Sequence, residues 1–217
     1  MMAQRDRQAP PRPAPRLYLV TPPVEDAAVF AAPLAAALEA GDVAAVLLRL
    51  APADERTLIN RIKALAPVIQ DRDAALILDG HAELVARGGA DGAHLTGIEK
   101  FGAALERLKP ERIAGAGGLA SRHEAMLAAE QGADYVMFGE PDAQCHRPGF
   151  DAIEERVTWW AELFQVPCVV YAAGLEEVGP LAAAGADFIA VGDFVWPAPE
   201  RNVAAAMRAL TSLETAA

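Results

Sequence analysis

Short apolar runs alternate along the chain with longer segments of helical periodicity. Two of these runs, Ala75–Leu78 and Cys168–Tyr171, are apolar at every position, which is typical of strands covered on both faces. The runs predict eight strands: Leu17–Val20, Val43–Leu48, Ala75–Leu78, Gly92–Leu95, Arg112–Gly115, Tyr135–Phe138, Cys168–Tyr171 and Phe188–Val191. The intervening segments predict eight helices: Val29–Ala40, Asp54–Val68, His81–Arg87, Ile98–Leu108, Arg122–Gln131, Asp151–Phe164, Glu176–Ala183 and Asn202–Leu213.

A short phrase recurs just before several of the predicted strands. It reads Gly89-Ala90-Asp91, Gly132-Ala133-Asp134 and Gly185-Ala186-Asp187, with a shortened form at Gly41-Asp42. Each copy follows an alanine- and leucine-rich helical segment, so it predicts a helix closed by a left-handed glycine and a tight turn into a buried strand. Repeated units of this kind indicate βα repeats and a parallel sheet.

Eight βα units in one chain of this length predict a TIM (β/α)8 barrel, in the α/β class, as a single domain over residues 16–217. An open doubly wound sheet is the alternative, but no glycine-rich dinucleotide fingerprint follows the first strand. Residues 1–15, MMAQRDRQAPPRPAP, are rich in proline and arginine, and we expect them to form a disordered arm.

The composition excludes several classes of protein. The 217 residues are 53% hydrophobic, which is too apolar for a disordered chain. The formal net charge of −11 argues against a nucleic-acid surface. No uncharged apolar run is long enough to span a membrane, and two cysteines are too few for a disulfide scaffold. We therefore expect a cytoplasmic protein that has neither a nucleic-acid nor a membrane partner.

Polar residues that follow the predicted strands are the candidates for chemistry, because barrel enzymes carry their sites at the carboxyl ends of the strands. These positions hold Thr21, Arg49, Asp79, His94, Thr96, Glu140, Tyr171 and Asp193. Arg49 follows a buried run and suits a phosphate or carboxylate group, or alternatively a structural ion pair with Asp79. Asp79 and Glu99 together would supply two carboxylates for one Mg²⁺, although such carboxylates also occur without a metal.

The other candidates each have a structural alternative. His94 either lines the barrel mouth or is a hydrogen-bonded core histidine. The long segment Gly139–Gly149, which carries His146 and Arg147, has the length of a functional lid.

The glycines around Gly117 and Gly118 permit close approach of a ligand to the backbone, or simply an open turn. The loops that begin at Ala173-Gly174 and Gly192 suit phosphate binding through backbone N–H groups, although Asp193 would repel a phosphate.

Several stretches resemble thiamine-phosphate synthases in their order and spacing, and they extend over nearly the whole predicted barrel. They are RLYLVT (Arg16–Thr21), VLLR (Val46–Arg49), ILDGHAELVARGGADGAHL (Ile77–Leu95), GADYVMFG (Gly132–Gly139), PCVVYAAGL (Pro167–Leu175) and GADFIAVGD (Gly185–Asp193). The resemblance implies a TIM-barrel transferase of thiamine biosynthesis. Such an enzyme joins hydroxymethylpyrimidine diphosphate to thiazole phosphate with Mg²⁺ and releases pyrophosphate.

The resemblance also implies roles for individual residues. Arg49 matches a diphosphate-binding arginine, Asp79 a Mg²⁺-binding aspartate, and Glu99 the position of a second metal-binding aspartate. Arg147 or His146 would replace a family lysine if their loop folds inward, and His94 lies in the family's histidine-leucine stretch. The remaining phosphate-binding candidates stand at family positions but differ in residue. Gly117 or Gly118 stands where the family has a serine, Ala173-Gly174 where it has two glycines, and Gly192 or Asp193 where it has another serine.

The chain departs from the family pattern at several of these positions. Leu47 stands where the family has glutamine, Ala51 where it has lysine, and Leu78 where it has asparagine. The predicted function is therefore that of a synthase with a degenerate site. The alternatives are an isomerase like the related thiazole tautomerase, with His94 or His146 as base, and a non-catalytic paralogue that binds a phosphorylated ligand. A homodimer paired through helix faces is compatible with either alternative.

Overall fold

The structure of the protein, a computed structural model, describes residues 13–142 and 144–212. Most of the predicted disordered arm, and Leu213 at the end of the last predicted helix, lie outside these residues. No helix within the described ranges is both long enough and apolar enough to cross a membrane.

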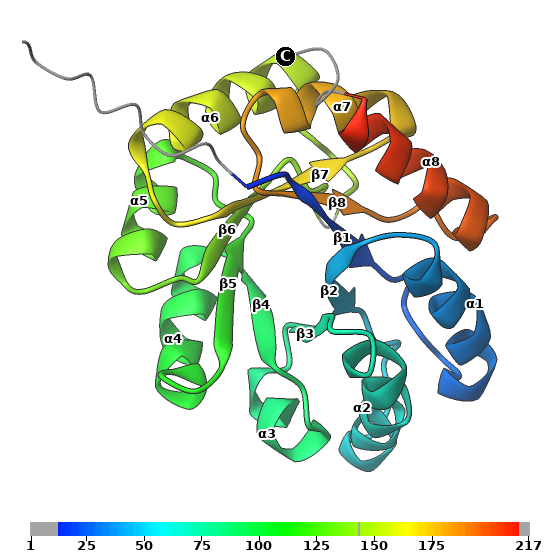
Figure 1. Ribbon diagram of the computed structural model, residues 1–217. Helices are drawn as coiled ribbons and strands as arrows, with labels where there is room; N and C mark the ends of the chain where they lie inside the picture. Colours follow the sequence, from blue (N-terminus) through cyan, green and yellow to red (C-terminus); the bar gives the residue numbers. More distant parts are fainter. Residues whose placement is uncertain (1–12, 143, 213–217) are drawn as a thin grey trace, which may run out of the picture.

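Eight parallel strands close into a barrel in chain order, and the helices form a ring around it (Figure 1). The predicted TIM barrel is therefore confirmed. The strands are β1 (Arg16–Val20), β2 (Val43–Leu48), β3 (Ala75–Asp79), β4 (Gly92–Thr96), β5 (Ile113–Gly117), β6 (Tyr135–Phe138), β7 (Cys168–Ala172) and β8 (Phe188–Val191). The helices are α1 (Ala27–Glu39), α2 (Glu55–Gln70), α3 (Val85–Gly88), α4 (Ile98–Leu108), α5 (Arg122–Glu130), α6 (Phe150–Leu163), α7 (Leu175–Ala183) and α8 (Pro199–Thr211).

Three elements differ from the sequence-based expectation. The fifth strand continues to Gly117, which pairs with Thr96 of β4, so the glycine run is part of the strand and not only a turn. The third helix is a single turn of 3₁₀ helix (Ala82–Leu84) followed by the short α3. The last helix begins at Pro199, ahead of the predicted start, because proline is well suited to the first turn of a helix.

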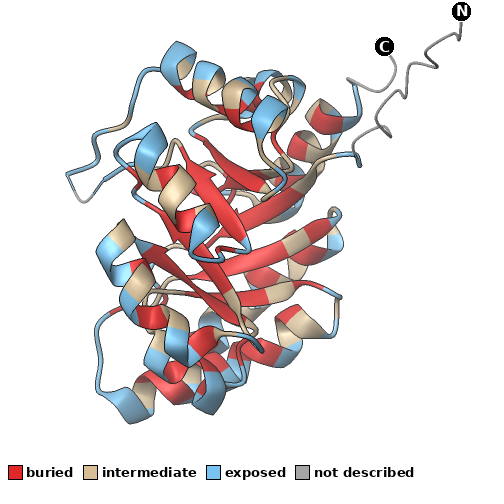
Figure 2. Cartoon of the chain, turned by 90° about the vertical axis from the view of Figure 1, so that its left-hand side faces the viewer, coloured by how far each residue is buried: buried red, intermediate tan, exposed pale blue. Residues whose placement is uncertain are grey.

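The strands are buried on both faces, as their uninterrupted apolar sequences predicted (Figure 2). One face packs against the helices through a large aliphatic cluster that includes Leu19, Leu48 and Leu76. The other face fills the barrel interior, where the residues are Tyr18, Val20, Ala45, Leu47, Ile77, Tyr135, Met137, Val169, Tyr171 and Ala190.

Glycine on β5 makes room for an aromatic residue in this interior. A Cβ atom at Gly115 would collide with the ring of Tyr135, its partner on the neighbouring strand β6. A similar collision with the backbone of Ile113 excludes a side chain at Gly92. The small residues of the interior therefore match its large ones, as close packing requires.

The aspartates of the recurring phrase join pairs of strands at the amino end of the barrel. The carboxylate of Asp91 accepts the backbone N–H of Leu76 at 2.7 Å, and its own N–H donates to the Leu76 carbonyl at 2.9 Å. Asp134 makes the same pair of bonds with Ala114, and Asp187 makes it with Cys168. Asp42 instead binds the Arg16 guanidinium. The repeat therefore encodes a strand-to-strand connection in addition to a turn.

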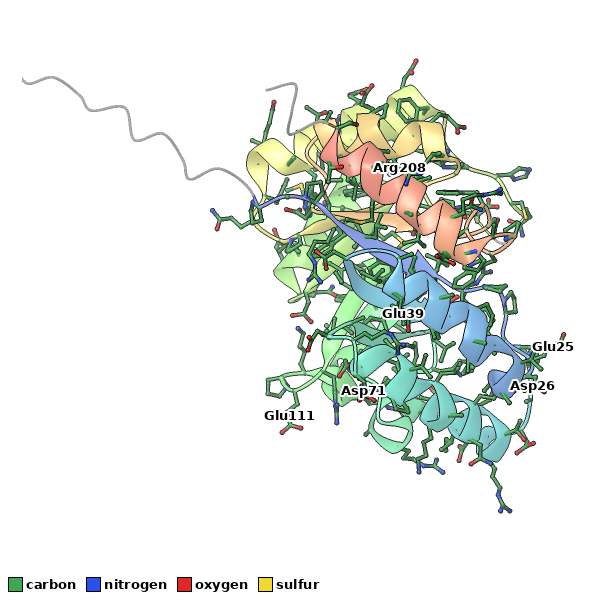
Figure 3. All side chains as sticks on the ribbon, turned by 45° about the vertical axis from the view of Figure 1, so that its right-hand side comes forward. Glu25, Asp26, Glu39, Asp71, Glu111 and Arg208 are labelled. Carbon is green, nitrogen blue, oxygen red and sulfur yellow. The ribbon has the colours of Figure 1, made fainter. Side chains whose placement is uncertain are left out.

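Figure 3 shows the barrel from the side, with α1, α2 and α8 in front. Glu25 and Asp26 precede α1 and lie at the carboxyl end of the strands. Glu39 and Asp71, at the ends of α1 and α2, lie at the amino end. The carboxyl end is the face on which the candidate residues were expected.

Replacing Asp91 with alanine should destabilise the protein, because it removes the acceptor for the N–H of Leu76 in a buried strand. We expect a loss of about 1–3 kcal/mol in the free energy of unfolding, measured by urea denaturation. Asp91→Asn keeps an acceptor oxygen and should lose less. Equal stability of D91A and the wild-type protein would contradict the role given to this carboxylate.

Candidate active site

Arg49 and Asp79 lie together at the carboxyl ends of β2 and β3. Arg49 Nε is 3.6 Å from Asp79 Oδ2, and the two side chains are 41% and 38% exposed. The backbone N–H of Arg49 donates to Thr21 Oγ1 at 3.0 Å, which ties the end of β2 to the end of β1. A partly exposed ion pair of this length is weak. It therefore leaves the guanidinium able to take an anionic ligand.

Two adjoining cavities open at this end of the barrel. The smaller, of about 120 Å³, is lined by Val20, Leu47, Arg49, Asp79, His94, Thr96, Met137, Glu140, Pro141, Tyr171 and Asp193. The larger, of about 750 Å³, shares Arg49, Thr96, Met137, Glu140 and Pro141 with it and continues past Gly118, Arg147 and Arg156. Arg49 thus lies between a small chamber that penetrates the barrel mouth and a wider space under the β6–α6 segment.

His94 on β4 is buried and hydrogen-bonded inside the barrel, as expected for a core histidine, which was one of its two sequence-based interpretations. Its Nδ1 lies 3.0 Å from the Tyr135 hydroxyl, which in turn lies 2.8 Å from the Tyr18 hydroxyl. The imidazole also stacks on the Tyr135 ring at a centroid distance of 5.7 Å. Burial lowers the pKa of His94 to about 4, although the nearby Asp79 carboxylate acts in the opposite direction. The ring is therefore neutral at pH 7.

The hydrogen bonds of the two tyrosines favour one tautomer of His94. Among the described residues, Tyr135 is the one hydrogen-bond partner of the Tyr18 hydroxyl, so every hydroxyl proton is used only if Tyr18 donates to Tyr135. Tyr135 then donates to His94 Nδ1, and the imidazole hydrogen is on Nε2. With this assignment, His94 presents an N–H donor, rather than a basic nitrogen, to the barrel mouth.

Glu140 begins the segment after β6, and its side chain turns back toward β5. Its Oε1 accepts the backbone N–H of Gly118, and burial raises the pKa of its carboxyl group. Glu140 lines both cavities. Glu140 is among the polar residues that follow predicted strands, but the resemblance implied no role for it. The sequence therefore did not predict it as a site residue.

Arg147 folds inward, as its predicted role required, and is held by protein groups. It forms a bidentate ion pair with Glu177 at 2.7 and 2.9 Å and donates to the carbonyl oxygens of Gly139 and Tyr171. Burial disfavours the charged form of Glu177, but its hydrogen bonds with Arg147 and with the N–H of Ala173 outweigh this and lower its pKa. Arg147 therefore ties the β6–α6 segment to the start of α7.

Backbone donors that were predicted to bind phosphate are occupied by carboxylates of the chain. The N–H of Gly118 donates to Glu140, and the N–H of Ala173 donates to Glu177 at 2.8 Å. A phosphate could use these two donors only by displacing a glutamate. The same loops thus have the geometry of an anion site in which carboxylates take the anion's place.

The other predicted site residues do not all lie at the two cavities. Gly117 ends β5 beside His94, whereas Gly174 and Gly192 line neither of the two cavities. Glu99 is exposed in the first turn of α4 and also lies outside both cavities. Within residues 13–142 and 144–212, no cluster of three or more metal-ligating side chains is present.

A closed (β/α)8 barrel with an arginine and carboxylates around a two-chamber cavity at its carboxyl end has the architecture of barrel enzymes that act on anionic substrates. Residues 17–195 match the family model described as thiamine monophosphate synthase. The chain belongs to this family.

Named relatives agree with this assignment. The thiamine-phosphate synthase of Rhodospirillum centenum is 43% identical over 194 residues, which covers 88% of this chain and 93% of the relative. The thiamine-phosphate synthase of Hyphomonas neptunium is 38% identical over 214 residues, with coverage of 94% and 96%.

Solved structures share the fold. Thiamine phosphate pyrophosphorylase from Pyrococcus furiosus superposes with a TM-score of 0.75 at 24% identity, covering 91% of this chain and 96% of that one. The 3-hexulose-6-phosphate synthase of Salmonella typhimurium reaches a TM-score of 0.70 at 15% identity, with coverage of 90% and 99%. At these identities the structures support the barrel and say nothing further about chemistry.

The buried, neutral His94 predicts a specific loss of stability in acid. An unfolded histidine takes up a proton near pH 6.5, whereas burial delays this in the folded state until about pH 4. The unfolded state therefore gains stability between these values, and folding stability falls by up to about 3 kcal/mol as the pH drops through them.

His94→Gln should lack this part of the pH dependence when urea unfolding is followed between pH 7 and pH 4. The exposed His123 on α5 offers a matched control, since His123→Gln should keep the wild-type slope. Parallel stability curves for wild type and H94Q would show that His94 is not a source of acid sensitivity.

Proposed function

We propose that the protein is a thiamine-phosphate synthase, a transferase that joins hydroxymethylpyrimidine diphosphate to thiazole phosphate and releases pyrophosphate. The observation that carries the proposal is the pair formed by Arg49 and Asp79 at the entrance of a cavity in a chain of this family. The relatives named thiamine-phosphate synthase support it, since they match over most of their length.

Arg49 and Asp79 would divide the work of holding the diphosphate. The guanidinium of Arg49 is always charged and offers a fork of donors that matches phosphate oxygens. Mg²⁺ in phosphate sites is commonly held by one or two carboxylates and by the substrate's own oxygens. The partly exposed carboxylate of Asp79 fits this use, and the bound metal would neutralise charge on the departing pyrophosphate. Glu99 is a weaker candidate because it is outside the cavities.

The cavity would contribute in two further ways. The apolar side chains of Val20, Leu47 and Met137 exclude water from the space in which a pyrimidine cation would form and be captured by the thiazole nitrogen. Arg156 borders the larger cavity and adds positive charge near the loop that follows β6. Arg147 would serve the same purpose only on release from Glu177.

Missing polar groups make this a site with fewer contacts than the family pattern implies. Leu47, Ala51 and Leu78 remove a glutamine, a lysine and an asparagine that the resemblance led us to expect. Each hydrogen bond to a charged phosphate is worth about 1.5–3 kcal/mol. We therefore propose a degenerate site, in which the diphosphate binds more weakly and turnover is slower than the family pattern implies. The tautomerase alternative is less favoured, because His94 carries its hydrogen on Nε2 and His146 is 82% exposed in its side chain.

We also propose a cytoplasmic location, a single barrel domain preceded by a short arm, phosphorylated small molecules as the ligands, and a homodimer formed through helix faces. Size-exclusion chromatography with light scattering would decide the assembly.

Calorimetric titration with hydroxymethylpyrimidine diphosphate, with and without Mg²⁺, tests the proposed site. We expect Mg²⁺-dependent binding that Arg49→Ala weakens at least tenfold, because the charge-assisted hydrogen bonds to the diphosphate are lost. Asp79→Asn should reduce the effect of Mg²⁺ more than the binding of the ligand alone.

Arg208→Ala provides the matched control, since Arg208 is an exposed arginine on α8, away from both cavities (Figure 3). It should bind as the wild-type protein does. Absence of binding at millimolar ligand with Mg²⁺ would overturn the proposed function, and equal affinities for R49A and R208A would remove Arg49 from the site.

A further inference from the structure

Two polar groups face the same small space at the end of β5. A Cβ atom at Gly117 would collide with Glu140 Oε1 and with His94 Nε2, so only glycine leaves this space open. Both residues line the smaller cavity. The diphosphate site described above does not use the carboxyl group of Glu140.

The two groups have opposite hydrogen-bonding character. The tyrosine chain behind His94 leaves its Nε2–H as a donor. Glu140 offers an acceptor oxygen whether or not its carboxyl group is protonated. The N–H of Gly118 holds the Glu140 carboxyl group at its place, so the acceptor is oriented before any ligand arrives. A donor and an acceptor side by side are complementary to an acceptor and a donor side by side on a ligand.

The space beside them suits one aromatic ring. The cavity measures about 120 Å³ and has apolar walls at Val20, Leu47 and Met137. It shares Arg49, Thr96 and Met137 with the larger cavity, so a ligand in it can extend outward. In the proposed pose a six-membered ring lies between these walls, with one edge toward Glu140 and His94 and its substituents toward Arg49 and the larger cavity.

We propose that Glu140 is a specificity-determining residue that recognises the amino group of an aminopyrimidine, while His94 Nε2–H donates to the neighbouring ring nitrogen. An amino group beside a ring nitrogen presents the required donor and acceptor on adjacent atoms. This inference rests on the proposed function, because it names the part of the pyrimidine diphosphate that the smaller cavity would read. It also explains how the pyrimidine would be recognised in this chain, because the side chain of Leu47, which lines the cavity, cannot form hydrogen bonds.

Four proteins and three ligands test the proposal by calorimetry in the presence of Mg²⁺. The proteins are wild type, Glu140→Leu, Glu140→Gln and Glu130→Gln, the last a control at an exposed glutamate on α5. The ligands are hydroxymethylpyrimidine diphosphate, its analogue without the ring amino group, and inorganic pyrophosphate. Circular dichroism checks that each variant is folded.

We expect E140L to bind the pyrimidine diphosphate about 10- to 100-fold more weakly than wild type, the range for one hydrogen bond to a charged or buried group. Pyrophosphate should bind E140L and wild type equally, and so should the analogue without the amino group. Glu140→Gln keeps an acceptor oxygen and should restore most of the affinity for the pyrimidine diphosphate. The E130Q variant should match the wild-type protein for all three ligands.

Three results would overturn the inference, and they are distinguishable from one another. Wild-type affinity of E140L for the pyrimidine diphosphate would remove Glu140 from recognition. Equal losses for all three ligands would show a structural or charge effect and no specificity. Binding of pyrophosphate alone by the wild-type protein would refute pyrimidine recognition and leave the diphosphate site standing, whereas binding of none of the ligands would refute the proposed function itself.

Discussion

The structure depends on the aspartates that tie successive strands together at the amino end of the barrel. Asp91, Asp134 and Asp187 each exchange two hydrogen bonds with the first residues of the preceding strand. These bonds hold the register of one strand against the next, and a shift of one residue would turn interior side chains toward the helices. Asp79 and His94 come to one opening because Asp91 holds β3 and β4 in this register.

The fold was predictable because its signals are local and repeated. Apolar runs and the Gly-Ala-Asp phrase each report on a few neighbouring residues, and eight predicted βα units leave few alternatives to a barrel. The meeting of Arg49 with Asp79 was also predictable, since both end adjacent strands. One exception in the fold was Gly117, because a glycine run does not reveal whether its backbone continues a strand.

The sequence could not reveal which donors and acceptors are already used. Arg147 was expected to replace a missing lysine, but its contact with Glu177 spans 30 positions of the chain and has no local sequence signal. The same holds for Glu140, whose partner Gly118 is on another strand-to-helix connection. Burial of His94 against Tyr135 and Tyr18 likewise determines its tautomer through contacts that spacing cannot show. The chemistry of the site therefore comes from long-range pairs that the barrel brings together.

The central claim is that this barrel still performs transfer to a thiazole phosphate and is more than a ligand-binding relative of its family. Pyrophosphate release, measured with purified protein, Mg²⁺, hydroxymethylpyrimidine diphosphate and thiazole phosphate, tests it most directly. The account predicts release that requires both organic substrates and yields one thiamine phosphate for each pyrophosphate. Absence of release with both substrates present, or release without thiazole phosphate, would contradict it.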